Sequence, residues 1–236
     1  MVSLSGLLAL LLALVHLVAG SVRSLRSSPR SRWLSVAGGA SVAYVFVHIL
    51  PELGEGETVL KYVTFLTQFI ERHVYLVALV GFIFFYGLER LVRVTEDKPE
   101  RQQNAVFVIH IGSFAAYNGL IGYLLVHQEE PGAVNLVLFA VAMGLHFVVN
   151  DVGFREDHEE SYNRLGRWLL AGAVIIGWSI GYATEIDEPL VNTLFAFLAG
   201  GIILNVIKEE LPEERKSRFW TFTVGAGSYS LLLLFV

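Results

Sequence analysis

Long apolar runs recur along the chain and restrict its fold more than any other feature. The runs cover residues 3–22, 34–53, 73–93, 104–126, 133–151, 166–183, 189–207 and 218–236. At about 1.5 Å of helical rise per residue, a run of about 20 residues crosses a hydrocarbon core of about 30 Å. The composition agrees, with 54% hydrophobic and 17% charged residues. The sequence therefore predicts an integral membrane protein.

The runs are continuous rather than alternating, which predicts membrane-spanning helices and excludes a β-barrel. Eight spans of about 20 residues occupy roughly 160 positions and leave no room for a domain outside the membrane. We expect one all-α transmembrane domain over residues 1–236. Its parts are the first three helices (1–93), the central two (104–151) and the last three (166–236).

Positive charge is distributed unevenly between the two sides of the predicted bundle. Alternate loops hold four, four, three and four Lys or Arg residues, which is 15 of the 17, and only Lys61 and Arg72 lie on the other side. Short cytoplasmic loops carry such an excess, so both termini are expected outside the cytoplasm. The first run lacks the positive residues that precede the core of a signal peptide, which predicts a retained helix. The opposite side is acidic, which suits either cation collection or a plain solvated loop.

A short pattern occurs twice, on runs that point in opposite directions. The second run contains Ala37-Gly38-Gly39 and then Leu50-Pro51-Glu52, and the seventh contains Ala199-Gly200-Gly201 and then Leu211-Pro212-Glu213. Inverted repeats of this kind are a common construction in secondary transporters, whose substrate sites form between the halves. The pattern predicts a 3+2+3 arrangement with the fourth and fifth spans at its centre.

Ionisable and amide residues gather on those two central spans and on the two repeated ones. Such residues are costly at bilayer depth and normally face the bundle interior. The fourth span has His110, Phe114, Tyr117 and Ile121 on one stripe, with Asn118 beside it; the fifth has His146, Asn150 and Asp151; the repeats have His48, Asn205 and Glu209. Imidazole, carboxylate and amide groups suit borderline divalent cations. They equally suit hydrogen bonding between helices.

These features together resemble the ZIP (ZRT/IRT-like) family of divalent-metal transporters. The segment His48-Ile49-Leu50-Pro51-Glu52 is similar to the family's His-Leu-Leu-Pro-Glu ending of the second helix. Glu209-Glu210-Leu211-Pro212-Glu213 is similar to its Glu-x-x-Pro-Glu ending of the seventh helix. The resemblance covers nearly the whole chain and implies that Glu209 lines a metal site.

The central helices depart from the family's signatures. Where the family has His-Asn-x-x-Glu-Gly, this chain has Tyr117-Asn118-Gly119-Leu120-Ile121-Gly122, which keeps the Asn but loses two ligands. The fifth-helix signature, approximately His-Glu-x-x-His-Glu, becomes His146-Phe147-Val148-Val149-Asn150-Asp151. The resemblance thus implies at most one weak site, formed by Asn118, His146, Asn150 and Glu209, with His48, His110 and Asp151 as weaker candidates.

The leading functional hypothesis is a ZIP-like transporter that moves a zinc-, iron- or manganese-class cation into the cytoplasm through a path between spans two, four, five and seven. The alternative is a transport-inactive member of the same fold with a structural or regulatory role, because Tyr117 and Ile121 replace ligands. An intramembrane zinc hydrolase needs about three good ligands and an activated water, which the central spans do not supply, so we expect no enzyme.

The sequence also bears on location and partners. We expect the cell membrane as the location, the lipid bilayer and divalent cations as partners, and no nucleic acid. A homodimer is left open. The metal is expected as transported substrate, with no resident cofactor.

Overall fold

The described part of the chain is helical throughout. The structure, a computed structural model, describes residues 2–19, 32–51, 74–95, 99–128, 132–210 and 218–235, and contains no strand within them. Its elements are α1 (Val2–Val18), α2 (Arg32–Tyr44), the π-helix η3 (Val45–Ile49), α5 (Val74–Thr95), α6 (Glu100–Leu124), α7 (Ala133–Asp157), α8 (Glu159–Ser161), the π-helix η5 (Tyr162–Gly166), α9 (Arg167–Ala183), α10 (Glu188–Glu210) and α11 (Phe219–Leu233). Because α2 continues into η3, and α8 into η5 and α9, these residues form eight helical segments, one for each apolar run.

Two helices extend well beyond their apolar runs. The sequence predicts that the fifth span ends at Asp151, but α7 continues to Asp157. It predicts that the sixth span begins at Gly166, but the helical chain already begins at Glu159. Hydropathy marks where polar residues begin, whereas backbone hydrogen bonding decides where a helix ends. As a result, Asp151 lies within α7 rather than at its end.

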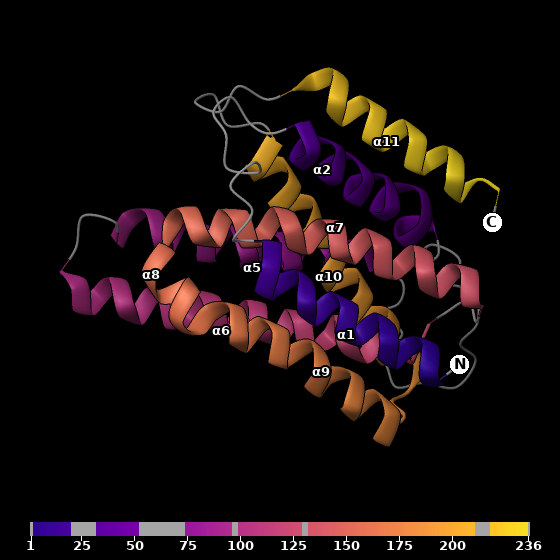
Figure 1. Ribbon diagram of the computed structural model, residues 1–236, viewed down its shortest axis with the longest axis horizontal. Coiled ribbons are helices and arrows are strands. Elements are labelled where there is room, and N and C mark those ends of the chain that lie inside the picture. Colours follow the sequence, from indigo (N-terminus) through magenta and orange to yellow (C-terminus); the bar gives the residue numbers. More distant parts are fainter. Residues whose placement is uncertain are drawn as a thin grey trace.

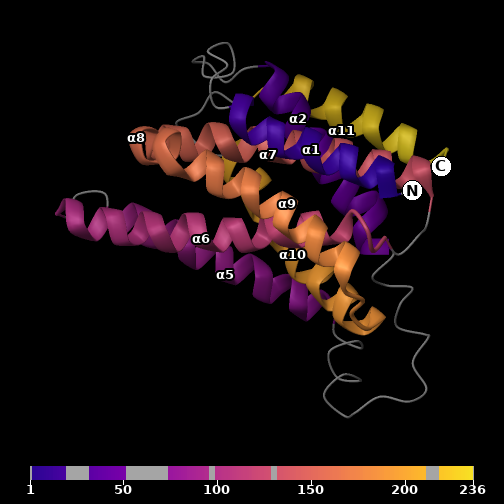
Figure 2. The same cartoon turned by 60° about the horizontal axis from the view of Figure 1, so that its bottom comes forward.

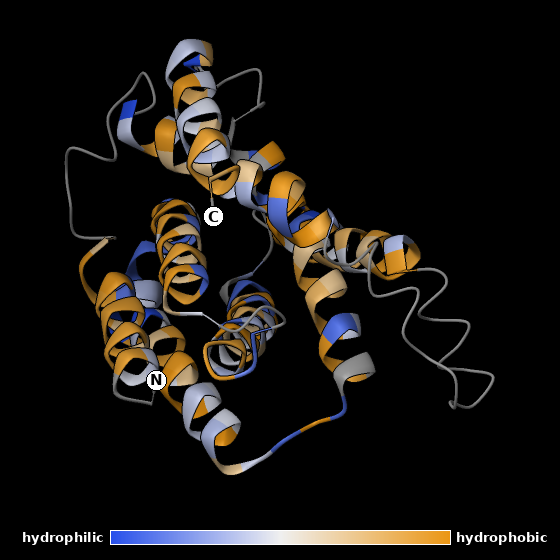
Figure 3. Ribbon diagram, turned by 90° about the vertical axis from the view of Figure 1, so that its right-hand side faces the viewer, coloured by the Kyte–Doolittle hydropathy of each residue, from blue (hydrophilic) through white to orange (hydrophobic). Residues whose placement is uncertain are grey.

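Within the residues that the structure describes, four helices are long and apolar enough to cross a membrane: Val74–Thr95, Gln102–Leu124, Ala133–Glu156 and Glu159–Ala183. Two shorter apolar helices cover Leu4–Val18 and Leu190–Asn205. Large apolar side chains are exposed on the outer faces of several helices, among them Leu10, Val80, Val108, Ile176 and Val224. Figure 3 shows hydrophobic residues around much of each helix. Such surfaces suit a lipid environment.

The helices form a bundle in which three pairs pack most closely. These pairs are α2 with α11, α6 with α9, and α5 with α10, while α1 lies against both α7 and α9. Figure 2 shows α5 beside α6, on the far side of the bundle from α2 and α11. The start of α1 and the end of α11 lie at the same end of the bundle (Figure 1). We call the opposite end, where α5 ends, α6 begins and α7 ends, the α5–α6 end.

Glycines allow the backbones of paired helices to touch. A Cβ at Gly177 would overlap the carbonyl of Gly119, and one at Gly181 would lie 2.9 Å from the carbonyl oxygen of Tyr123. The spacing of Gly177 and Gly181 predicts a small-residue packing face, and the contact of α9 with α6 confirms it. Side chains larger than hydrogen at these positions would force the helices apart.

The glycines of the repeated pattern also act at helix contacts. A Cβ at Gly39 in α2 would overlap the Phe222 carbonyl of α11, and one at Gly200 in α10 would overlap the Ala78 carbonyl of α5. Each copy of the pattern therefore brings one neighbouring helix into backbone contact.

Candidate functional site

The polar residues predicted to face the interior are buried there. His110, Asn118, His146, Asn150 and Asp151 are at most 8% exposed. The apolar members of the α6 stripe, Phe114 and Ile121, are buried as well. This burial confirms the prediction that these faces of α6 and α7 point inward. The physical reason is that unpaired polar groups facing lipid would be costly.

His146 forms the centre of a first polar group. Its Nε2 atom lies 3.0 Å from the Tyr117 hydroxyl and 2.9 Å from Asn150 Nδ2. With Nε2 as acceptor, the phenol and the amide both donate to a neutral imidazole that carries its proton on Nδ1. His146 and Asn150, which are predicted to share a face of this helix, are thus in hydrogen-bond contact. The Tyr117 hydroxyl bonds to the same imidazole nitrogen from α6.

A second polar group contains a residue that the sequence does not single out. His16 of α1 donates from Nδ1 to Asp151, at 2.9 Å from Oδ1 and 3.0 Å from Oδ2. Asn118 Nδ2 donates to Nε2 of the same ring over 3.1 Å. The Tyr162 hydroxyl donates to the His16 carbonyl oxygen over 3.2 Å.

The sequence feature that could have identified His16 is its position as a lone histidine within a Leu-rich apolar run. An intramembrane ionisable residue normally has a partner, and Asp151 needs one. The sequence predicts that Asn118 lies with His146, but its amide nitrogen bonds to His16 instead. The two polar groups are nevertheless adjacent, since the His16 ring lies 4.3 Å from that of Phe147, the residue next to His146.

A third polar group lies nearer the α5–α6 end. Oε1 of Glu89 on α5 lies 2.8 Å from Lys208 Nζ on α10 and 3.3 Å from His110 Nε2 on α6. All three side chains are largely buried. The sequence places Lys208 among the loop charges and does not single out Glu89, because the two residues lie 119 positions apart in the chain.

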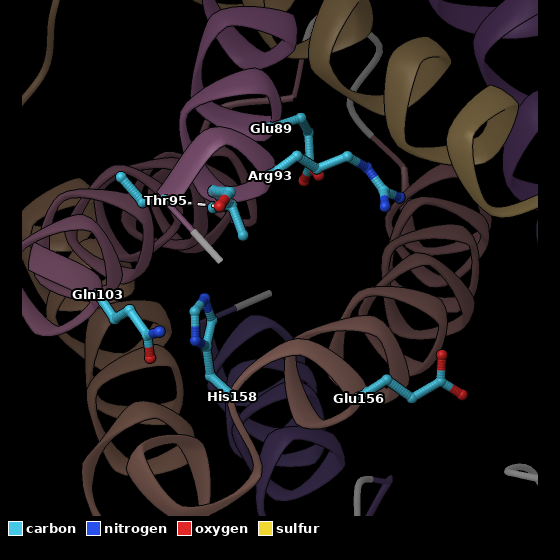
Figure 4. A pocket seen from close by; sticks show the side chains of 7 residues that line it. Glu89, Arg93, Thr95, Gln103, Glu156 and His158 are labelled. Atoms are coloured by element: carbon cyan, nitrogen blue, oxygen red, sulfur yellow. Dashed lines mark hydrogen bonds between the residues drawn. The ribbon is translucent and has the colours of Figure 1, made fainter. Parts of the chain in front are cut away.

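Two hollows adjoin this third group. A small cavity of about 10 Å³ is lined by Glu89, His110, Phe114, Asn150, Phe154, Asn205 and Lys208. A cleft of about 140 Å³ at the α5–α6 end is lined by Glu89, Val92, Arg93, Thr95, Gln103, Glu156 and His158. Figure 4 shows Thr95 and His158 on opposite sides of this cleft. Glu89 borders both hollows, and Asn150 connects the cavity to His146.

The remaining candidates lie on the repeated helices. His48 is part of η3, where Leu50 N–H bonds back to the Val45 carbonyl, and its ring lies 4.8 Å from that of Tyr44. π-helical turns are frequent at functional sites. Glu209 belongs to α10, but its side chain lies outside the described residues, as do Glu52 and Pro212.

The donors therefore lie in small hydrogen-bonded groups rather than in one centre. Among the described residues, no three His, Cys, Asp or Glu side chains gather closely enough to hold a metal ion. The arrangement can bind a cation weakly through nitrogen and amide oxygen. It can also simply tie helices together. The sequence matches no family model, and a search of curated proteins finds no match.

Proposed function

We propose that the protein is a ZIP-like membrane carrier that moves a divalent cation of the zinc, iron or manganese class into the cytoplasm. One observation supports it above the others. Polar side chains from α6, α7 and α10, namely His110, Asn150 and Asn205, line the same small cavity. Three of the four helices proposed to form the path thus contribute donors to one place, as expected for a site between two halves of a carrier.

The proposed topology places eight spans in a 3+2+3 arrangement, with both termini outside the cell membrane. In such a repeat α2 corresponds to α10, and α11 corresponds to α5. The α2–α11 pair therefore corresponds to the α10–α5 pair. Both pairs pack through backbone contacts at a repeated glycine, Gly39 in one and Gly200 in the other. This correspondence supports an inverted repeat.

The proposed path runs from His146 to the α5–α6 end. In the orientation given by the Lys and Arg distribution, that end faces the cytoplasm. The cavity and the cleft follow one another there, while Ile121, Leu124, Phe139 and Met143 are fully buried towards the opposite end. Such an arrangement would suit a carrier that is closed to the outside.

Weak coordination suits such a path. His146 and Asn150 would hold the cation transiently, and Glu209 is expected to complete the site, with Asp151, His48 and Asn118 available only if their present partners change. Asn118 and Asp151 are both bonded to His16. Conduction requires binding that is weak enough for release, so few ligands are compatible with transport.

The second candidate is a transport-inactive protein of the same fold. The observation in its favour is the hydrogen bond from Tyr117 to His146, because it occupies the one imidazole among the four main predicted ligands. With Tyr117 and Ile121 both buried in the centre, a structural or regulatory role needs no open path.

Metal uptake into proteoliposomes distinguishes the two. We expect wild-type protein to take up Zn²⁺ or Mn²⁺ and His146→Ala to lose at least about tenfold of that flux, because the only imidazole at the centre of the path is gone. His127→Ala is the matched control, since His127 bonds to the Gly181 and Thr184 carbonyls away from the path. Equal fluxes from wild type and His146→Ala, or no flux from either, would contradict carriage through this path.

A further inference from the structure

One carboxylate, that of Glu89, lines both the cleft and the small cavity. Glu89 lines both hollows, and its Oε1 atom is shared by the Lys208 ammonium at 2.8 Å and the His110 imidazole at 3.3 Å. A cation that moves between the cavity and the α5–α6 end therefore passes Glu89. The free Glu89 carboxylate would attract the cation, whereas the carboxylate paired with the Lys208 ammonium would present a neutral surface.

The spacing between Glu89 and His110 also fits two ligands of one metal ion. Their Oε1 and Nε2 atoms are 3.3 Å apart, and neither ring nitrogen of the 2% exposed His110 has a hydrogen-bond partner among the described residues. Two ligands at Zn²⁺ distances and a tetrahedral angle lie about 3.4 Å apart. The pair is thus spaced as the two ligands of a tetrahedral ion would be.

The small cavity supplies further donors. Asn150 and Asn205 both line it. Amide oxygens supplement carboxylate and imidazole as ligands for divalent cations. A cavity of about 10 Å³ has room for one water-sized sphere, which is enough for a dehydrated metal ion.

Lys208 occupies the position of a cation in this arrangement. Its ammonium neutralises Glu89, which allows the carboxylate to stay buried. The lysine stem is flexible, and Lys208 lies in the last turn of α10. The ammonium can therefore leave Glu89 without unfolding a helix.

We propose that Glu89 and His110, with the Asn150 and Asn205 amides, form a second divalent-cation site on the cytoplasmic side of the path, which Lys208 occupies until the cation displaces its ammonium. Lys208 is then a tethered competitor that keeps this site weak and allows release. The choice of a divalent cation rests on the proposed function. The site itself is tested by equilibrium binding, which requires no transport.

Titration of the detergent-purified full-length protein with Co²⁺ tests the site. Tetrahedral nitrogen and oxygen ligation gives Co²⁺ a characteristic visible absorption. Lys208→Met should bind Co²⁺ at least about tenfold more tightly than wild type, because one positive charge next to the ion has gone. Adding Glu89→Gln to Lys208→Met should abolish that gain, and His110→Phe should change the absorption bands. Arg93→Met is the matched control, as it removes a charge from the same cleft one helical turn away from Glu89.

The outcomes separate the two proposals. If Lys208→Met binds no more tightly than wild type, or if the Glu89→Gln/Lys208→Met protein retains the gain, the second site is wrong even when transport is observed. If His146→Ala stops uptake but leaves the cobalt spectrum of Lys208→Met unchanged, both proposals stand. Should Lys208→Met aggregate, Lys208→Gln keeps a hydrogen-bond donor to Glu89, and the same gain in affinity is expected from it.

Discussion

At the scale of single residues, the pair formed by His16 and Asp151 has the clearest energetic consequence. Their side chains are 1% and 0% exposed, and Asn118 donates to the His16 ring while Tyr162 donates to the His16 carbonyl oxygen. Removal of one partner of a buried hydrogen-bonded pair leaves the other without its partner, whereas removal of both does not.

Asp151→Leu is therefore expected to destabilise the protein by about 1–3 kcal/mol. The physical reason is that His16 would lose the acceptor that takes its Nδ1 proton. The free energy of unfolding in detergent, monitored by circular dichroism, is the quantity to compare with wild type.

His16→Leu combined with Asp151→Leu is the control for that experiment. The double variant should be more stable than the sum of the two single losses predicts, because no unpaired polar group is left behind. Strict additivity would contradict the pairing of these two side chains.

At the scale of helices, α6 and α9 are joined by backbone contact. Gly119 and Gly122 of α6 face Gly177 and Val174 of α9 so closely that a Cβ on Gly122 or Gly177 would overlap a carbonyl group. Glycine is otherwise unfavourable within a helix, by roughly 1 kcal/mol relative to Ala. Its use here is explained by close approach alone.

Gly177→Ala should consequently destabilise the protein by about 1–3 kcal/mol, because the added methyl group forces α9 away from α6. Gly172 lies on the same helix, and a methyl group added there would have no neighbouring atom within 4 Å. Gly172→Ala should leave stability unchanged or raise it slightly. Thermal unfolding of both variants in one detergent compares them, and similar losses from both would contradict the contact.

At the scale of the whole molecule, the proposed orientation can be tested cleanly because the chain has no cysteine. Glu159 begins α8, whereas Glu185 lies in the loop after α9, so the two residues lie at opposite ends of one continuous helical segment. Both are exposed.

A membrane-impermeant maleimide should label Glu185→Cys in intact cells and Glu159→Cys only after the membrane is permeabilised, since the Lys and Arg excess predicts that the α8 end faces the cytoplasm. The reverse labelling pattern would mean that the bundle has the opposite orientation and that the cleft faces away from the cytoplasm.

The sequence predicts much of this architecture and only part of the site. Apolar runs locate the helices, and the spacing of His110, Tyr117, His146 and Asn150 identifies inward faces, because helical periodicity is a local property. It does not determine which inward faces meet. His16 and Asp151 are 135 residues apart, and Glu89 and Lys208 are 119 apart, so both pairs depend on tertiary packing. Asn118 lies on the predicted face but meets a different neighbour for the same reason.

The glycine contacts that join α2 to α11 and α5 to α10 have a consequence for motion. Backbones held at such short range cannot slide past one another without losing many dispersion contacts at once, so each pair is expected to move as a rigid unit. Any change of access to the centre is then expected at helix contacts outside these two pairs. The hydrogen bond from Tyr117 to His146 joins α6 to α7 and is one such contact.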